Sequence, residues 1–238
     1  MQNDLNFETF LFFGPKKIIL SVNQKKNFKQ IFKNEILIDD YSNKLNLEKL
    51  NNFLNENIFK IEKILDSFIK SINIAVFSED IFTLKISVKK NNHNEKIHKS
   101  TLIYLLNDAK DYCKKSMQNK KIIHFLIDNF LVDNSFYKEL PTNIKCENFS
   151  LDLSFICLPD VIVKNIERIL ENYQISVNKF LSASYVEEYS TRENLDFFQC
   201  MSNIIEGGNP NEVKLVQKIL KNKGFFEKFF DLVDCIFW

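Results

Sequence analysis

The sequence predicts an α/β fold built on a mixed sheet. Three observations lead to this prediction: strand-like and helical patterns alternate along the 238 residues, 45% of the residues are hydrophobic, and 26% are charged. Such a chain has enough apolar side chains for one medium domain or two small ones. No apolar run approaches the roughly 18 residues of a membrane-spanning helix, and no signal segment opens the chain. We therefore expect a cytoplasmic protein.

The first part of the chain predicts a β-β-β-α-β unit. Residues 9–22 form a hairpin that turns at residues 14–17, because a Gly-Pro step separates two runs rich in β-branched and aromatic residues. A third strand over residues 34–39 precedes a long helix that begins near Asn46, since apolar residues recur there at helical spacing. Residues 72–77 are a short apolar run bounded by polar residues, which predicts a buried strand.

The middle of the chain predicts a second group of strands with one helix. Residues 82–90 alternate as a half-exposed strand and lead into a polar loop, NNHNEKIHKS, over residues 91–100. Ser100 is the expected N-cap of a helix that ends at Ser116. The segment KIIHFLIDNFLVDN contains two strand-like runs, and residues 149–159 alternate most clearly of all.

The last part of the chain predicts helices. Asp160 caps a helix over residues 161–173, and a short strand over 175–177 leads into a helical stretch over 180–189. A further helix is expected to start at Asn209, with Pro210 at its first position and Gly224 just past its end.

The composition argues against several classes of function. The 32 basic and 31 acidic residues give a net charge of +1, so we expect no nucleic-acid partner. Only four glycines are present, and neither a GxGxxG nor a Walker-type loop occurs. The five cysteines lack CxxC spacing and are expected to be buried free thiols. The three histidines, His93, His98 and His124, are scattered, so no metal site is predicted.

Residues 82–189 resemble FtsA, the actin-like family of bacterial cell division, and most closely its inserted subdomain 1C. The resemblance rests on KIIHFLIDNFLVDN, on Asn-Ile-Glu-Arg at 165–168, on residues 174–177, and on Leu-Ser-Ala-Ser at 181–184. It extends over roughly residues 10–189. The resemblance implies half of an actin-like (RNase H-like) fold that carries a small inserted α+β subdomain. The implied parts are a 1A-like subdomain (1–81 and 179–200), a 1C-like insert (82–178) and a helical tail (201–238).

The chain departs from this family at the nucleotide site. Gly14 and Lys17 match the family's first phosphate loop, but Phe12 stands where the family has an acidic residue that helps to hold the metal. No second glycine-rich loop follows residue 190, and subdomains 2A and 2B are not expected. We therefore expect no enzyme activity, no cofactor and no metal, with a residual actin-like ATP-binding protein as the alternative.

The C-terminal residues 225–238 predict an amphipathic helix, since Glu227, Asp231 and Asp234 form one narrow stripe among apolar side chains. FtsA ends in a membrane-targeting helix, so the resemblance implies a lipid-binding helix here. Its membrane-binding residues are Phe225, Phe226, Phe229, Phe230, Val233, Ile236, Phe237 and Trp238. In the alternative interpretation, the protein is a soluble protein-interaction domain whose tail packs on the sheet.

The resemblance also implies partners and a location. FtsA subdomain 1C binds other proteins and itself, so we expect divisome proteins or a second copy to bind the 1C-like subdomain. Contact with FtsZ is not expected, because that contact lies in subdomain 2B. The implied function is a non-catalytic cell-division adaptor that is peripheral on the cytoplasmic face of the inner membrane at the division site.

Overall fold

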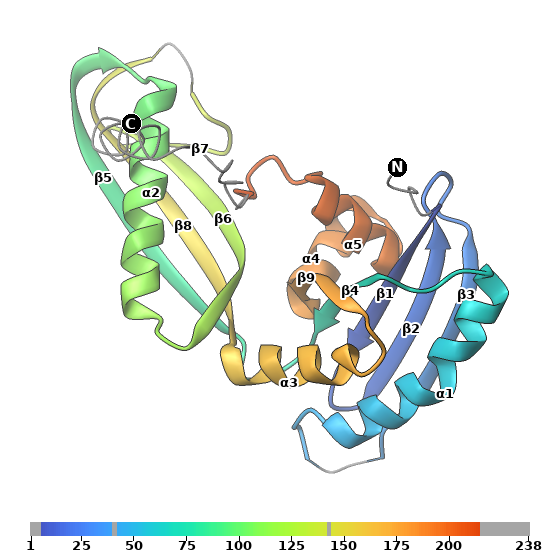
Figure 1. Ribbon diagram of the computed structural model, residues 1–238. Coiled ribbons are helices and arrows are strands. Elements are labelled where there is room, and N and C mark those ends of the chain that lie inside the picture. The colour runs from blue at the N-terminus through green and yellow to red at the C-terminus, as the bar shows by residue number, and fades with distance from the viewer. Residues whose placement is uncertain (1–5, 40–41, 142–143, 215–238) are drawn as a thin grey trace, which may run out of the picture.

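The computed structural model describes residues 6–39, 42–141 and 144–214. Two sheets are present in this part of the chain, each with its own helices, and they lie side by side (Figure 1). The first sheet belongs to a unit built from the N-terminal part of the described chain and from residues 160–206, after which the chain crosses to the second sheet. The second sheet is inserted between two strands of the first. The predicted fold class is therefore confirmed: a mixed α/β sheet that carries a smaller α+β insert.

The first sheet has the strand order β3-β2-β1-β4-β9. Its strands are β1 (Phe7–Phe13), β2 (Lys17–Gln24), β3 (Gln30–Leu37), β4 (Ser71–Val76) and β9 (Ser176–Ser182). Strands β1 to β3 form an antiparallel meander, whereas β4 is parallel to β1 and β9 is parallel to β4. Helix α1 (Leu47–Leu65) makes the crossover that parallel pairing requires. This order is the RNase H-like arrangement that the resemblance implies.

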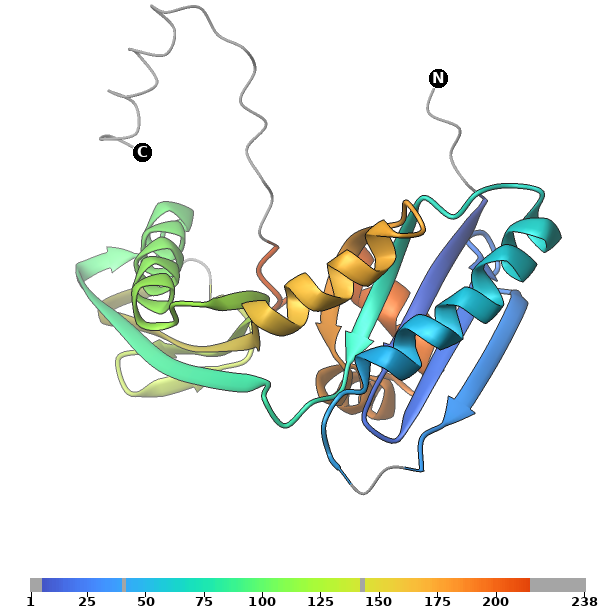
Figure 2. The same cartoon turned by 60° about the horizontal axis from the view of Figure 1, so that its bottom comes forward.

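Helices cover both faces of the first sheet. Figure 2 shows α1 and α3 (Asp160–Glu171) in front of it, and α4 (Ala183–Glu193) and α5 (Phe197–Glu206) behind it. Phe53 of α1 is buried in the core on the first face. On the second face the ring of Phe198 in α5 lies 6.0 Å from that of Phe10 in β1. Because both faces are covered, β1 is buried almost along its whole length.

The second sheet has the order β5-β8-β6-β7, and all of its pairings are antiparallel. Its strands are β5 (Phe82–Lys96), β6 (Lys120–Val132), β7 (Ser135–Tyr137) and β8 (Lys145–Pro159), and its helix is α2 (Lys99–Ser116). Phe125 and Phe155 stack 4.2 Å apart in a separate core between sheet and helix. On β8, Asp152 and Ser154 alternate with the core residues and therefore project from the opposite face.

Helix α3 packs with the first unit, although the sequence analysis placed residues 160–178 in the insert. Its buried residues Val163, Ile166 and Leu170 belong to the core of the first sheet. The core of the second sheet contains residues between Ile97 and Cys157. Defined by its own core, the inserted unit therefore ends with β8.

Several sequence predictions about the strands need correction. Strand β5 does not end at Lys90, because it continues to Lys96 through an irregularity at His93 and Asn94, both of which have positive φ. The polar residues there indicated a loop, but they belong to an exposed edge strand. The two predicted strands in KIIHFLIDNFLVDN are one strand, β6, whose alternation is disturbed by two register shifts.

The helix boundaries differ as well. Helix α2 begins at Lys99 with His98 at its N-cap, so Ser100 is not the cap. Residues 180–182 are not helical but form the end of β9, where they pair with β4. Helix α5 was not predicted, although Asp196 caps its start and Gly207 its end.

The helix predicted from Asn209 is wrong in the described part of the chain. Residues 210–211 form a turn and Glu212 makes an isolated β-bridge to Leu126. The predicted hairpin at residues 9–22 and the helix predicted to begin near Asn46 are confirmed, and Asn46 is the N-cap of that helix. No described helix combines the length and apolar character that crossing a bilayer requires. The predicted free thiols are confirmed for Cys113, Cys146, Cys157 and Cys200, all buried, and Cys235 lies outside the described residues.

The core of the second sheet can be tested by comparing a buried and an exposed phenylalanine of that sheet. Phe155 is completely buried, so Phe155→Ala is expected to lower the free energy of unfolding by about 3–5 kcal/mol. Phe136 is 68% exposed, so Phe136→Ala is expected to change it by less than about 0.5 kcal/mol. Urea unfolding followed by circular dichroism measures both, and equal losses would contradict the assigned core.

Candidate functional site

Residues 209–214 join the two units at the end of the described chain. Helix α5 ends the first unit, and the chain then crosses to the second sheet, where it pairs with β6. The Ile127 N–H donates to the Asn211 carbonyl at 2.9 Å, and the Val213 N–H donates to the Phe125 carbonyl at 2.8 Å. These bonds occupy part of the β6 edge that β7 leaves free, because β7 pairs only with Phe130–Val132. The segment thus acts as a short extra strand.

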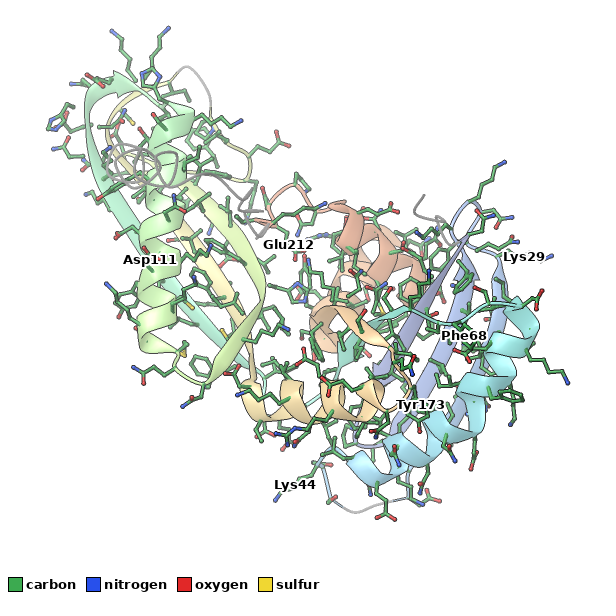
Figure 3. All side chains as sticks on the ribbon, in the orientation of Figure 1. Lys29, Lys44, Phe68, Asp111, Tyr173 and Glu212 are labelled. Carbon is green, nitrogen blue, oxygen red and sulfur yellow. The ribbon has the colours of Figure 1, made fainter. Side chains whose placement is uncertain are left out.

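A buried polar cluster lies where this segment meets both units, and we call it the clasp. It consists of His124 from β6, Ser182 and Tyr185 from the β9–α4 junction, and Asn209 and Glu212 from the crossing segment. Nδ1 of His124 lies 2.9 Å from Oε1 of Glu212, and their side chains are 0% and 4% exposed. Figure 3 shows Glu212 between the two units.

The hydrogen bonds of His124 define its proton position. The backbone N–H of Ser182 donates to Nε2 at 3.0 Å, so Nε2 must carry a lone pair. The proton of the neutral ring is therefore on Nδ1, from which it is donated to Glu212. A second proton on Nε2 would point at the Ser182 N–H, so protonation of the ring breaks this contact between the units.

Glu212 has partners on both carboxylate oxygens. The Tyr185 hydroxyl donates to Oε2 at 3.1 Å, and Asn209 donates to the same hydroxyl at 2.8 Å. Nζ of Lys179 lies 3.8 Å from Oε1. Because these groups accept and donate in a consistent direction, the cluster buries one carboxylate without leaving it unpaired.

Burial and partners shift the pKa values of the clasp in predictable directions. Burial lowers the pKa of His124 below 6.5, against the opposing effect of Glu212. Burial alone would raise the pKa of Glu212, but the His124 N–H, Lys179 and the Tyr185 hydroxyl together lower it below 4.5. Burial also raises the pKa of the Tyr185 hydroxyl. At neutral pH the clasp thus contains a carboxylate, a neutral imidazole and a neutral phenol.

A groove of about 740 Å³ lies beside the clasp, between the polar face of the second sheet and α4. We call it the inter-unit groove. Lys85, Asp128 and Ser154 line it from the sheet, and Glu188 and Arg192 line it from α4. Its other lining residues are Ile81, Thr83, Leu126, Ile127, Lys138, Ile156, Ser182, Ser184, Tyr185, Asn209 and Asn211. The groove therefore offers charges of both signs and several hydroxyl and amide groups to a ligand.

Two hydrogen bonds fix polar groups of the inter-unit groove in place. The Ser154 hydroxyl donates to Oδ2 of Asp128 at 2.6 Å, and Nζ of Lys138 donates to Asn129 at 2.8 Å. Neither a histidine nor a cysteine is among the described residues that line the groove, and the imidazole of His124 is buried. The geometry thus favours recognition through hydrogen bonds and ion pairs.

The predicted phosphate-loop residues lie elsewhere, at the turn between β1 and β2. Phe12 is 5% exposed and belongs to the first core. The Gly14 N–H donates to the Lys17 carbonyl at 3.0 Å, so the turn closes on itself. Nζ of Lys17 lies 4.9 Å from the Phe12 ring, which is a cation–π contact. The backbone and side-chain groups expected to hold phosphate are thus engaged with one another.

The predicted membrane-binding residues, Phe225, Phe226, Phe229, Phe230, Val233, Ile236, Phe237 and Trp238, lie outside the described residues. The clasp was not predicted from the sequence. The one available signal was His124, a titratable residue inside an apolar run. Glu212 gave no such signal, because it lay in a segment whose Asn-Pro start and glycine end indicated a helix.

Comparisons with known proteins give distant structural matches. No protein-family model and no curated protein matches the chain. The cytoplasmic domain of EpsL, an inner membrane component of the type II secretion system of Vibrio cholerae, is 11% identical with a TM-score of 0.38, covering 76% of this chain and 58% of that one. The PilM–PilN type IV pilus biogenesis complex is 8% identical with a TM-score of 0.43, covering 79% and 50%.

A third match is a Bacteroides thetaiotaomicron protein with an actin-like ATPase fold and unknown function. It is 11% identical with a TM-score of 0.34, covering 79% of this chain and 57% of that one. The chain thus spans 50% to 58% of the length of these three structures. The coarse resemblance, to one half of an actin-like fold, agrees with the sheet order and the insertion. None of the three structures is described as an FtsA protein.

The clasp predicts that acid destabilises the protein. Because the folded-state pKa of His124 lies below 6.5, the unfolded chain takes up a proton more readily as the pH falls through that value. Glu212 adds a further loss below pH 4.5. The contribution of these two groups to the free energy of unfolding is therefore expected to be fully present above about pH 6.5 and to decrease progressively below it.

Urea unfolding at a series of pH values measures this dependence. His124→Gln is expected to reduce the loss of stability that begins near pH 6.5. The matched control is His93→Gln, because His93 is exposed. An unchanged pH dependence in His124→Gln would contradict the assigned role of the clasp.

Proposed function

We propose that this protein is a non-catalytic adaptor that binds another protein through the inter-unit groove. The observation that carries the proposal is the groove itself, which has walls from both units. Hydrogen bonds fix Ser154 and Asp128 on the sheet and Tyr185 on α4. Its volume of about 740 Å³ is large enough to hold several side chains of a bound segment. Lys85 and Arg192 provide cations, and Asp128 and Glu188 provide anions, so the partner segment is polar with charges of both signs.

The closed turn at Gly14 supports the non-catalytic part of the proposal. An actin-like nucleotide site needs free backbone N–H groups and a carboxylate near the metal. Here the Gly14 N–H is bonded to Lys17, and an apolar ring, Phe12, occupies the position of the carboxylate in the resemblance. We therefore propose no bound nucleotide and no cofactor for this unit.

The resemblance to FtsA leads to a more specific proposal. The adaptor belongs to the bacterial cell-division machinery, and its 1C-like insert binds divisome proteins or a second copy of the chain. The apolar tail holds the protein on the cytoplasmic face of the inner membrane, with no direct contact to FtsZ and none to nucleic acid. The apolar spacing of residues 225–238 supports the membrane contact.

Site-specific photo-crosslinking tests the groove. A photoreactive phenylalanine analogue at Thr83 or Ser184, both in the groove lining, is expected to capture one discrete partner in cells. The same analogue at Tyr112, which is 58% exposed on α2, is the control and is expected to capture none of it. Charge reversal of Lys85 together with Arg192 is expected to weaken capture at Thr83 about tenfold or more.

Equal capture at all three positions would contradict recognition by the groove. Micromolar binding of Mg-ATP in isothermal titration would contradict the non-catalytic part and favour a residual actin-like ATP-binding protein.

Liposome pelleting tests the membrane contact separately. The full chain is expected to pellet with vesicles, whereas a chain that lacks residues 224–238 is expected to stay in the supernatant, because each buried Phe, Ile or Val contributes about 1.5–3 kcal/mol. Equal pelleting of both would show that the tail is not the membrane contact and would favour a tail that packs on the fold.

A further inference from the structure

Three adjoining hollows run along the first unit from the place where the described chain ends. The first, of about 300 Å³, lies between β6 and β9 and includes Val213 in its lining. The second, of about 440 Å³, lies along the start of β9 and shares Val177 with the first. The third, of about 460 Å³, lies beside α1 and shares Gln174 with the second. The hollows thus form one continuous surface, which we call the β9 groove.

The far end of the β9 groove exposes two large aromatic side chains. Phe59 and Phe68 line the third hollow and are each 75% exposed. Ile58 and Tyr173 also line it. Figure 3 labels Phe68 and Tyr173 on this unit, away from the inter-unit groove. Two exposed phenylalanines in one hollow offer apolar surface on which another apolar segment can pack.

The charged side chains of the second and third hollows have one sign. Glu167 and Glu171 line the second hollow, and Glu62 lines the third. Neither lining contains a lysine or arginine among the described residues, although the chain has 32 such residues in total. Lys121 pairs with Glu167 at 3.5 Å, and Glu62 accepts the Ile69 N–H, whereas Glu171 is exposed. The occupant of these hollows is therefore expected to be basic as well as apolar.

The residues that follow the described chain have this chemistry. The sequence over 215–224 is LVQKILKNKG, which contains no acidic residue. Its cations are Lys218, Lys221 and Lys223, and its apolar residues are Leu215, Val216, Ile219 and Leu220. We propose that residues 215–224 of this chain dock in the β9 groove of the same molecule, with Ile219 and Leu220 against Phe59 and Phe68 and with their lysines beside the glutamates.

The length of the segment suits this path. Nζ of Lys179 in β9 lies 3.8 Å from Oε1 of Glu212, so the path of the docked segment along the β9 groove starts beside Lys179. From Lys179 back to Gln174 is five residues, or about 17 Å along an extended chain. Ten residues span about 15 Å as a helix and at most about 36 Å when extended. An extended conformation of residues 215–224 therefore reaches the third hollow, whereas a fully helical one falls just short of it.

The order of residues along the segment agrees with the order of the hollows. Leu215 and Val216 come first, at the hollow that Lys121 and Lys179 line, where a cation would be repelled. The lysines come later, where the hollows are lined by glutamates. The docked segment leaves residues 225–238 available for a separate contact, so this inference does not depend on the proposed function.

Amide hydrogen exchange of the full chain, read by mass spectrometry on peptides from residues 215–224, tests the proposal. These amides are expected to exchange at least about tenfold more slowly than the unstructured rate. The double variant F59S/F68S is expected to lose most of this protection, and Glu171→Lys part of it. Both phenylalanines are exposed, so the double variant is expected to keep its fold, as circular dichroism checks.

Phe136→Ser is the matched control, since Phe136 is 68% exposed but lies on the second sheet, and it is expected to leave the protection unchanged. Exchange of residues 215–224 at the unstructured rate in the unaltered chain would overturn the proposal. Protection that survives F59S/F68S would overturn it as well. Protection that disappears on dilution would assign the groove to a second copy and would equally overturn docking within one molecule.

Discussion

One buried hydrogen bond, between His124 and Glu212, sets the relative placement of the two units together with Ile123, Ile156 and Leu158 of the second sheet, which pack into the first core. His124 belongs to the second sheet, and its other nitrogen accepts a backbone N–H from Ser182 in the first unit. Glu212 belongs to the segment that crosses between the units, and Tyr185 fixes its second oxygen. Because each group is satisfied only when all three segments meet, the clasp specifies one arrangement of the units and penalises others.

The turn at Gly14 corresponds to the first phosphate loop of the FtsA family in the resemblance described above. In this protein the residue at position 12 packs in the hydrophobic core. A phenylalanine at position 12 adds about 1.5–3 kcal/mol of burial, whereas a carboxylate buried there would need a cation and hydrogen bonds to balance its loss of hydration. Lys17 then packs over the Phe12 ring instead of facing a phosphate. The same residues thus contribute to the stability of the hairpin.

Local elements were predictable from the sequence, whereas the clasp was not. The Gly-Pro turn and the helical spacing of apolar residues after Asn46 are local patterns, and they predicted β1, β2 and α1. The His124–Glu212 bond joins residues that are 88 positions apart, and no local pattern specifies such a pair. The segment that begins at Asn209 had a strong helical start, but pairing with the free edge of β6 determined its conformation in the described residues.

The clasp and the inter-unit groove are parts of one structure, since Tyr185 and Asn209 belong to both. Tyr185 donates to Glu212 and also lines the groove, and Asn211 lines it while accepting a hydrogen bond from β6. Any change that releases Glu212 therefore also moves groove-lining side chains. Conversely, a ligand that holds both walls of the groove together favours the closed clasp, because binding and clasp closure are thermodynamically linked. The polar face of the second sheet, which α2 leaves uncovered, thus forms one wall of the inter-unit groove beside the clasp.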